Sequence, residues 1–242
     1  MKKKKYDLLH EDEDYIIINK SAPLLSLPDR WDPEIPNALH YMKVKADDIY
    51  MVHRLDKETS GVMVFAKNEK SHAHACRLFE NRDVHKEYLG IIEGNLSAKS
   101  GEIDQPIMSL PSSKGKMHIN PEGKPSLTEY DVQVSFKGYS VVKFVPKSGR
   151  THQIRVHTAF LGAPILADKV YGYSNEFRLS TIKRRKFKLK KNEVERPLMA
   201  RHALHAHKIS FDGINGKLIS AEHEPPKDMR ATINQMGKWI AE

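Results

Sequence analysis

The residues with the greatest potential for chemistry lie in a polar loop over positions 52–61. Seven of its ten residues are charged or hydroxylic, and it ends in glycine. The candidates for a chemical role are His53, Arg54, Asp56 and Thr59. A polar loop held by a rigid element suits side chains that act on a substrate, because the scaffold fixes only the backbone. The alternative is a surface turn with a local ion pair between Arg54 and Asp56, contributing only about 0–1 kcal/mol.

A second candidate is Tyr88, which stands in the segment Lys86-Glu87-Tyr88 at the start of an apolar run that reaches Gly94. The run predicts a strand. Taken by itself, a tyrosine in a strand is most simply a core ring whose hydroxyl lies at the edge of the core. Its position alone therefore predicts packing rather than chemistry.

A third group of candidates lies within residues 149–157 and consists of Arg150, His152, Gln153 and Arg155. A glycine turn, Thr151 as candidate N-cap and the apolar period that follows predict a helix ending near Gly162. A cation near the start of a helix opposes the helix dipole. We therefore expect Arg155 to have an anionic partner.

These three stretches together resemble one known family. His-Arg-Leu-Asp at 53–56, followed by Thr-Ser-Gly at 59–61, resembles the catalytic signature of the RluA family of RNA pseudouridine synthases. Lys-Glu-Tyr at 86–88 resembles the second motif of that family, and residues 149–157 resemble its Gly-Arg-Thr-His-Gln segment. The resemblance covers about residues 10–236. It implies the catalytic domain alone, without the N-terminal S4 domain that many relatives carry.

The resemblance implies a role for each candidate. Asp56 is the catalytic carboxylate, Tyr88 lies against it, and Arg155 pairs with it. Arg54 fills the stack that a flipped base leaves, and Leu204 lines the uracil pocket. The further residues expected to bind substrate are His53, Thr59, Arg150, His152 and Gln153.

The pairing of Asp56 with Arg155 has a physical rationale. Burial raises the pKa of a carboxyl group, whereas a nearby cation lowers it by about 1–3 units. At about 4 Å and an effective dielectric near 20, the attraction is about 4 kcal/mol. Whether the carboxylate attacks C1′, attacks C6 or abstracts a sugar proton stays open. The isomerisation is redox-neutral, so we expect no cofactor and no metal.

The positive charge of the chain is concentrated in one region. The net charge is +9, and residues 143–196 contain 14 Lys/Arg against 4 Asp/Glu, a balance of +10. This concentration favours a polyanion-binding face over a generally basic surface. Within an apparent insertion at 173–200, residues 183–191 hold seven basic residues, including Lys183, Arg184, Arg185 and Lys186. We expect an RNA-contacting element that is mobile without ligand; an exposed strand or a disordered charged segment is the alternative.

The expected fold belongs to the α/β class, of the α+β type. It is a single pseudouridine synthase domain over 1–242, with a mostly antiparallel mixed sheet, flanking helices and a central basic cleft. The expected strands are 15–18, 62–67, 86–94, 128–134, 139–145, 201–211 and 217–220. The expected helices are 37–45, 69–81, 151–162 and one capped by a proline pair and Asp228. Residues 95–126 predict a hairpin with a basic tip at 112–116.

Several classes of protein are excluded by composition. The single Cys76 allows no internal disulfide and no cysteine zinc cluster. No run approaches the roughly 18 apolar residues of a membrane helix. The lysines at 2–5 are followed by acidic residues rather than an apolar segment, so no signal peptide is expected. His202, His205 and His207 would face both sides of a strand, which disfavours zinc.

The sequence therefore predicts a cytoplasmic, monomeric RNA pseudouridine synthase that acts on ribosomal or transfer RNA. One alternative is a non-catalytic RNA-binding or ribosome-assembly module, which would need neither Asp56 nor Tyr88. A second is a glycosidase that uses Asp56 and Glu58 as its carboxylate pair. Two carboxylates in one loop, two residues apart, lack the facing separation of about 5–9.5 Å that such enzymes use.

Overall fold

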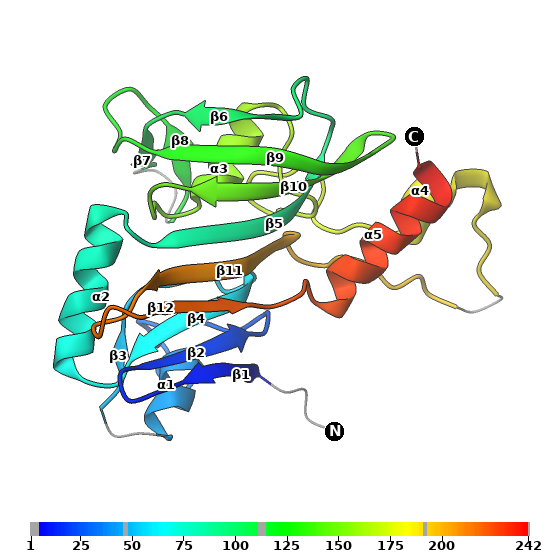
Figure 1. Cartoon of the computed structure of the whole chain (residues 1–242). Helices are drawn as coiled ribbons and strands as arrows, with labels where there is room; N and C mark the ends of the chain where they lie inside the picture. The colour runs from blue at the N-terminus through cyan, green and yellow to red at the C-terminus, as the bar shows by residue number, and fades with distance from the viewer. Residues whose placement is uncertain (1–4, 46–47, 111–114, 191–192, 242) are drawn as a thin grey trace. The chain divides into compact units, whose positions relative to one another are not determined.

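The structure, a computed structural model, describes residues 5–45, 48–110, 115–190 and 193–241. The chain folds into two compact units (Figure 1). The first unit consists of Met1–Tyr88 and His205–Pro225, and the second of Leu89–Leu204 and Pro226–Glu242. Each unit is therefore built from two segments that are far apart in the sequence.

The first unit contains a sheet with the strand order β1, β2, β4, β11, in which β12 also pairs with β11 and β3 with β4. Its strands are β1 (Tyr6–Glu11), β2 (Tyr15–Lys20), β3 (Tyr50–Met51), β4 (Ser60–Ala66), β11 (Leu204–Asp212) and β12 (Leu218–Glu222). All of these pairings are antiparallel except β4 with β11. β5 (His85–Glu93) begins in this unit and continues into the second.

Strands β2 and β4 are buried along their whole length because both faces of the sheet are covered. Ile17 and Val64 pack into one apolar cluster with Ala75 of the helix at 69–81. Ile18 packs into the other, with Met42 of the helix at 38–43. A strand that is buried on both faces has no polar side to present, which explains the near-continuous apolar run of β2.

The helices of the first unit are α1 (Ala38–Lys43) and α2 (Glu69–Asn81). The bounds of α2 agree with the predicted helix over 69–81. It starts at Asn68, whose Oδ1 accepts the Ser71 N–H at 2.9 Å, because the first N–H groups of a helix need partners outside it. It ends where Arg82 takes a left-handed conformation with φ +69°.

The second unit has its own run of strands in the order β5, β10, β9, β6. These are completed by β6 (Ser100–Asp104), β9 (Leu127–Phe136) and β10 (Tyr139–Pro146), with a separate pair, β7 (Ile107–Ser109) and β8 (Met117–Ile119). Lys137 and Gly138 form the predicted turn between β9 and β10, and Gly138 has the positive φ (+81°) of such turns. Most of the predicted basic tip at 112–116 lies outside the described residues.

The helices of the second unit are α3 (Gln153–Phe160), α4 (Leu179–Lys183), a 3-10 turn (Arg184–Lys186) and α5 (Lys227–Ile240). The N-cap prediction for Thr151 is wrong, because α3 starts after His152, which has φ +56° and makes no side-chain cap. The cap prediction for Asp228 is also wrong. Pro226 precedes α5, and Asp228 lies in its first turn, where Arg201 donates to it at 2.9 Å.

The predicted class of fold is confirmed: a mostly antiparallel mixed sheet with a few helices. The described part of the basic segment, 183–190, contains the end of α4 and the 3-10 turn and no strand, so the exposed-strand alternative is wrong. Within the described ranges, no helix is both long and apolar enough to cross a membrane.

Candidate active site

The polar loop at 52–59 connects β3 to β4. Its C-terminal end is fixed where β4 closely approaches β11. Gly61 has φ +122° and pairs with Ala206 of β11. A Cβ atom at this position would lie 2.1 Å from the Ala206 carbonyl oxygen. One residue earlier, Ser60 Oγ and His205 Nδ1 lie 3.0 Å apart. The glycine that closes the motif is therefore required by backbone contact, not by loop flexibility.

A buried lysine holds the backbone of the loop. Lys20, at the end of β2, is 0% exposed. Its Nζ donates to the carbonyl oxygens of Leu24 at 2.8 Å, Asp56 at 3.2 Å and Lys57 at 3.5 Å. An ammonium group is costly to bury unless its donors are satisfied, and here three carbonyl groups from two loops satisfy them. The sequence analysis did not identify this residue as part of the site.

A serine and an apolar anchor complete the support. Ser26 Oγ donates to the Leu55 carbonyl at 2.7 Å and accepts the Leu55 N–H at 3.0 Å. The Leu55 side chain is buried in the apolar cluster beneath the loop. The loop closes on itself where the Thr59 N–H donates to the Asp56 carbonyl at 3.1 Å. The backbone at 55–57 is thus fixed from several sides, while the Asp56 side chain stays half-exposed and Arg54 exposed.

Tyr88 lies close enough to Asp56 to interact with its charge. Its ring packs against the same apolar cluster as Leu55. Burial raises the pKa of its hydroxyl, and the negative charge of Asp56 raises it further. The hydroxyl is therefore protonated at neutral pH and able to donate a hydrogen bond. The two residues that the resemblance names as catalytic neighbours interact electrostatically within the first unit.

His53 is engaged by the fold. Its Nε2 accepts the Val64 N–H at 3.0 Å, and its ring stacks on Phe79 with centroids 4.9 Å apart. Removal from water, and secondarily the charge of Lys86, lower its pKa to about 3. The ring is therefore neutral at physiological pH, as it must be for its Nε2 to accept the Val64 N–H. These contacts support a structural role and do not favour substrate binding.

Lys86 belongs to the same group of packed side chains. Its ammonium lies 5.5 Å from the centroid of the Phe79 ring. Burial, and then the charge of Arg82, lower its pKa to about 8. The residue precedes Tyr88 by two positions in β5. Only the fold reveals that this lysine is buried.

In the second unit, Arg155 has the anionic partner that its place near a helix start predicts. Its Nε donates to Asp168 Oδ2 at 2.6 Å and its Nη2 to Oδ1 at 2.8 Å, and both side chains are buried. Burial alone would raise the pKa of Asp168, but the hydrogen bonds and charge of Arg155 bring it below its ordinary value. The guanidinium also lies 5.1 Å from the Tyr171 ring centroid. The pairing of Arg155 with Asp56 stays a prediction.

The remaining residues of the third motif build the start of α3. Gln153 is buried, and its Nε2 donates to the Leu127 carbonyl and to Thr128 Oγ1, both at 2.9 Å. Its Oε1 accepts the Arg150 N–H at 3.1 Å. Both polar atoms of the Gln153 side chain thus make hydrogen bonds within the protein. His152 Nδ1 lies 2.9 Å from the Tyr171 hydroxyl. Among the described residues, the buried Nε of Arg150 has no hydrogen-bond partner.

Leu204, the residue expected to line a uracil pocket, is buried in the second unit. A Cβ atom on Gly90 would lie 3.4 Å from its Cδ1 and 2.9 Å from the Phe144 ring. Leu204 and the Phe144 ring thus pack directly against the backbone of Gly90, where a larger residue would clash. In the part of the chain that the structure describes, no three His, Cys, Asp or Glu side chains come together as a metal site would require.

Comparison with protein families agrees with this arrangement. Residues 14–160 match the model of the family described as RNA pseudouridylate synthase. A ribosomal large subunit pseudouridine synthase D from Haemophilus ducreyi is 34% identical over 243 residues, covering 95% of this chain and 70% of that protein. The protein of the same name from Escherichia coli K12 is 38% identical over 171 residues, covering 69% of this chain and 52% of its own. The chain thus spans between about half and 70% of the length of these relatives.

Solved structures show the same fold. The human RNA pseudouridylate synthase domain containing 4 protein matches with a TM-score of 0.74 at 26% identity, covering 95% of this chain and 92% of that one. The human domain containing 1 protein matches in fold with a TM-score of 0.68 at 21% identity, over 96% and 94%. With the motif at 53–61 on its supported loop and the family model over 14–160, this chain belongs to the RNA pseudouridylate synthase family.

Proposed function

We propose that the chain is an RNA pseudouridine synthase that isomerises uridine in ribosomal RNA, with Asp56 as the catalytic carboxylate. The observation that carries the proposal is the support of the Asp56 loop. Lys20 and Ser26 fix its backbone, while the Asp56 side chain remains accessible beside Tyr88. The names of the relatives refer to the large ribosomal subunit, which favours ribosomal over transfer RNA as the substrate.

The reaction makes specific demands on the site. The bond from C1′ to N1 of uridine breaks, the base rotates, a bond from C1′ to C5 forms, and the C5 proton leaves. N1 takes up a proton in exchange for the one that C5 loses to water, so the product is an isomer of uridine. Asp56 supplies the carboxylate that attacks or stabilises the sugar or the base. The Tyr88 hydroxyl keeps its proton at neutral pH and can donate a hydrogen bond next to the Asp56 carboxylate. In the proposal it also takes part in proton transfer during the rearrangement.

The third motif supplies the cation that the carboxylate needs. Arg155 is held by Asp168 through two hydrogen bonds, so its guanidinium has a fixed orientation. In the proposal it pairs with Asp56 and keeps that carboxylate ionised when RNA excludes water from the site. Arg150 of the same motif is half-exposed, and in the proposal its guanidinium contacts a phosphate of the bound RNA.

A uridine in a stacked helix is unreachable, so the target base must leave its stack at a cost of a few kcal/mol. Arg54 is exposed on the same loop as Asp56, where it can occupy the space that the base leaves. In the proposal, Leu204 lines the pocket that receives the extruded uracil, as the family resemblance implies. The proposal further takes the two units as one catalytic domain that acts as a monomer in the cytoplasm.

The test is tritium release from large-subunit ribosomal RNA labelled at C5 of uridine. The Asp56→Asn variant should lose release by at least about a thousandfold, because an amide can neither attack nor carry the charge. Its affinity for the RNA should stay within about twofold of the unaltered protein. The control is Glu58→Gln, the other carboxylate of the loop, which should keep most of the activity.

Two outcomes would reject the assignment. Turnover by Asp56→Asn would remove the catalytic role of that carboxylate. RNA binding by the unaltered protein without any tritium release would favour the non-catalytic RNA-binding module instead.

A further inference from the structure

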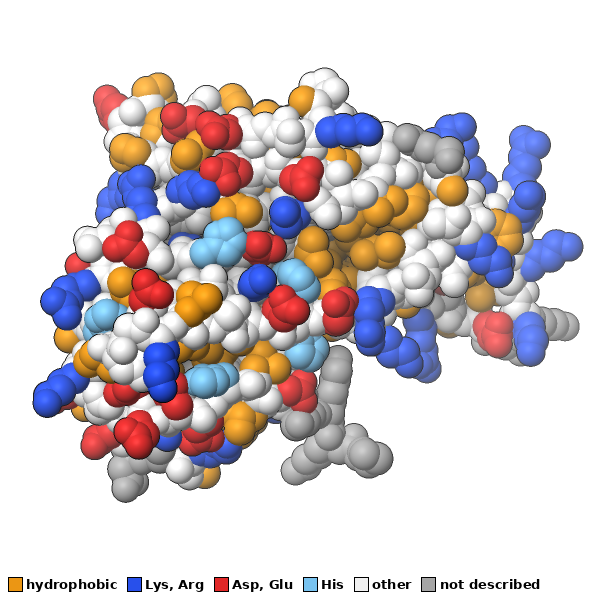
Figure 2. Space-filling view, in the orientation of Figure 1, with side chains coloured by type: hydrophobic (Ala, Val, Ile, Leu, Met, Phe, Trp, Pro, Cys, Tyr) orange, Lys and Arg blue, Asp and Glu red, His pale blue; other side chains and the backbone are white. Residues whose placement is uncertain are grey.

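The largest concentration of exposed charge in the second unit lies directly after α4. We call this segment, residues 183–190, the basic arm. Its six cations are Lys183, Arg184, Arg185, Lys186, Lys188 and Lys190, and it contains no acidic residue. Lysine and arginine side chains gather at the right-hand edge of Figure 2, where Figure 1 places α4 and the segment after it. The arm is a distinct surface feature.

The arm is joined to a well-packed base. Phe177 and Met199 pair as an isolated antiparallel bridge, and both side chains are buried. Ile182 of α4 is buried as well, and α4 packs against α5 (Figure 1). Backbone pairing therefore brings together Phe177 and Met199, which lie before and after the arm in the sequence. Apolar contacts hold α4, the helix that leads into the arm.

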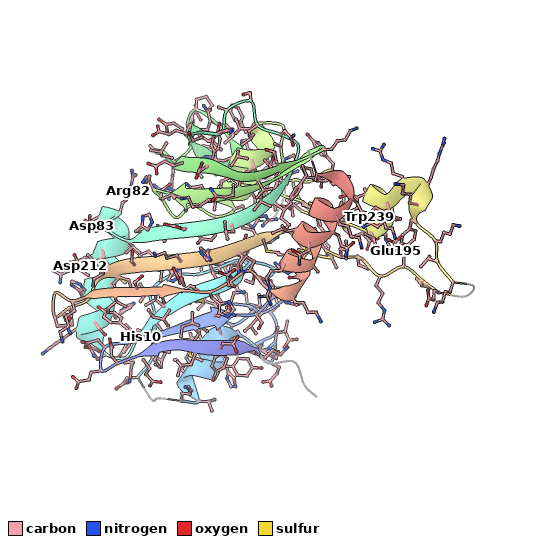
Figure 3. The ribbon with its side chains drawn as sticks, turned by 45° about the vertical axis from the view of Figure 1, so that its right-hand side comes forward. His10, Arg82, Asp83, Glu195, Asp212 and Trp239 are labelled. Carbon is pink, nitrogen blue, oxygen red and sulfur yellow. The ribbon has the colours of Figure 1, made fainter. Side chains whose placement is uncertain are left out.

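A cation–π contact fixes the start of the arm. Lys183 Nζ lies 4.5 Å from the centroid of the Trp239 ring on α5 and 6.0 Å from that of Phe187. Figure 3 shows Trp239 near the end of α5, beside α4. The indole N–H donates to Gln235 at 3.1 Å, which fixes the ring. The aromatic face attracts the ammonium electrostatically. Lys183 thus serves as the attachment point of the arm to α5.

The acidic residues near the arm are engaged at its base. Glu176 accepts from Arg178 at 2.7 Å. Glu195 accepts the Ser180 N–H at 2.8 Å, and its carbonyl oxygen accepts from Arg178. Among the described residues, no carboxylate lies within ion-pair distance of the five cations Arg184, Arg185, Lys186, Lys188 and Lys190, all of which are exposed. At the far end of the arm, the Glu193 carboxylate accepts the backbone N–H of Lys190 at 3.3 Å. The side chains of these five cations thus leave the arm with a net positive charge.

Two neighbouring lysines extend the same surface. Lys238 lies on the last turn of α5, with its Nζ 5.6 Å from the Trp239 centroid. Lys137 lies at the tip of the β9–β10 hairpin, where its N–H donates to the Ile240 carbonyl at 3.0 Å. Both side chains are exposed. The hairpin tip, the end of α5 and the arm thus present cations from three elements of one unit.

We propose that this surface, the basic arm with Lys137 and Lys238, binds the phosphate backbone of structured RNA without reading its sequence. Exposed, separated cations recognise phosphates, whereas base recognition requires positioned donor and acceptor pairs. A protein partner would need apolar anchors, and Leu189 is the only exposed large apolar side chain in the described residues 183–190. The inference rests on the proposed function for the identity of the polyanion.

The first test compares two variants of the full chain with equal loss of charge. The arm variant carries Arg184→Gln, Arg185→Gln, Lys186→Gln and Lys188→Gln. The control carries Lys43→Gln, Lys70→Gln, Arg77→Gln and Lys217→Gln, four exposed cations of the first unit. The dissociation constant for a large-subunit ribosomal RNA transcript is measured from 50 to 300 mM KCl.

We expect the arm variant to lower the slope of log K against log salt by about 3, because each phosphate contact contributes about 0.7–0.9. Its affinity at 150 mM KCl should fall at least about tenfold. The control should change the slope by less than about 1. An unchanged slope in the arm variant, or an equal change in both variants, would overturn the inference.

The second test concerns the attachment at Trp239. Trp239→Ala should lower the salt slope by about 1, because the arm loses its fixed start, whereas Trp239→Phe keeps an aromatic face for Lys183 and should leave the slope nearly unchanged. Thermal unfolding checks that both variants fold. Equal slopes for the two variants would contradict this part of the inference.

The two proposals fail separately. If no RNA releases tritium but the arm variant alone loses its salt slope, the proposed function fails and the RNA-binding surface stands. If tritium is released at equal KM by the arm variant and the unaltered protein, the surface fails and the proposed function stands. If polyglutamate displaces the protein as well as an RNA duplex of equal charge does, the surface is not specific for nucleic acid.

Discussion

The Asp56 loop, residues 52–59, and the basic arm are both polar, charged segments, yet they are held in the structure in opposite ways. In the loop, the backbone is fixed by groups beneath it: Lys20 and Ser26 hold the carbonyl groups of Leu55 to Lys57. In the arm, five side chains are exposed and have no carboxylate partner in the described chain, and the attachment lies at one end, on Trp239. Chemistry requires fixed positions, whereas phosphate binding requires exposed charge.

This contrast has a consequence for stability. Groups that hold the loop are buried, so their removal leaves buried polar atoms unsatisfied. Cations of the arm are hydrated in the free protein, so their removal costs little. Substitutions in the two regions should therefore differ sharply in their effect on the free energy of unfolding, and three further experiments test that difference.

The largest effect is expected at the close approach of β4 and β11. In Gly61→Ala, the added Cβ would lie 2.1 Å from the Ala206 carbonyl oxygen at φ +122°. We expect a loss of about 4 kcal/mol or more in the free energy of unfolding, measured by urea denaturation. The matched control is Gly138→Ala, where φ is +81° but no atom lies within 4 Å of the added Cβ. It should lose only about 1 kcal/mol; similar losses in both would contradict the steric explanation.

The second effect separates support of the loop from mere folding. Lys20→Met leaves the carbonyl groups of Leu24, Asp56 and Lys57 without their donor, at a cost of about 2–4 kcal/mol. Because a misplacement of about 1 Å can cost a hundredfold in rate, kcat should fall by about that factor while KM changes little. The control is Lys208→Met, a half-exposed lysine of β11. Wild-type kcat in the folded Lys20 variant would exclude a positioning role.

The smallest effect is a pH dependence. The pKa of His53 is lowered to about 3 in the folded protein, mainly by burial, whereas an unfolded histidine titrates near 6.5. His53 therefore contributes stability that is fully present above about pH 6.5 and is lost as the pH falls toward 3. Between pH 7 and pH 5 the loss should be about 1–2 kcal/mol. His53→Gln, which keeps an acceptor for Val64 but does not titrate, should lose less over this range; equal losses would refute the assignment.

Local sequence was a good guide wherever local interactions decide the structure. The bounds of α2 follow from the cap at Asn68 and the apolar stripe after it. The β9–β10 hairpin follows from strand alternation on either side of Lys137 and Gly138. The position of the Asp56 loop follows from a dense polar motif placed directly before a buried strand. Each of these signals lies within about a dozen residues.

Contacts between distant residues were not predictable in the same way. Nothing near Lys20 indicates that its ammonium reaches Asp56, 36 positions later. Asp168 was not predicted as the partner of Arg155, because a separation of 13 positions in the sequence does not by itself indicate a contact. The role of His53 depends on Val64 and Phe79 meeting around its ring. A left-handed residue at His152, in place of a cap at Thr151, depends on buried contacts of Gln153.

The sequence by itself therefore determined the family, the order of the three motifs, the carboxylate at Asp56 and the concentration of positive charge after residue 143. These depend on the kinds of residue and their spacing, which can be read directly. Only the tertiary structure decided which charges are buried and which remain exposed, because desolvation depends on neighbours that the chain brings together from far away. That division separates Lys20, buried beneath the loop, from the exposed cations of the arm.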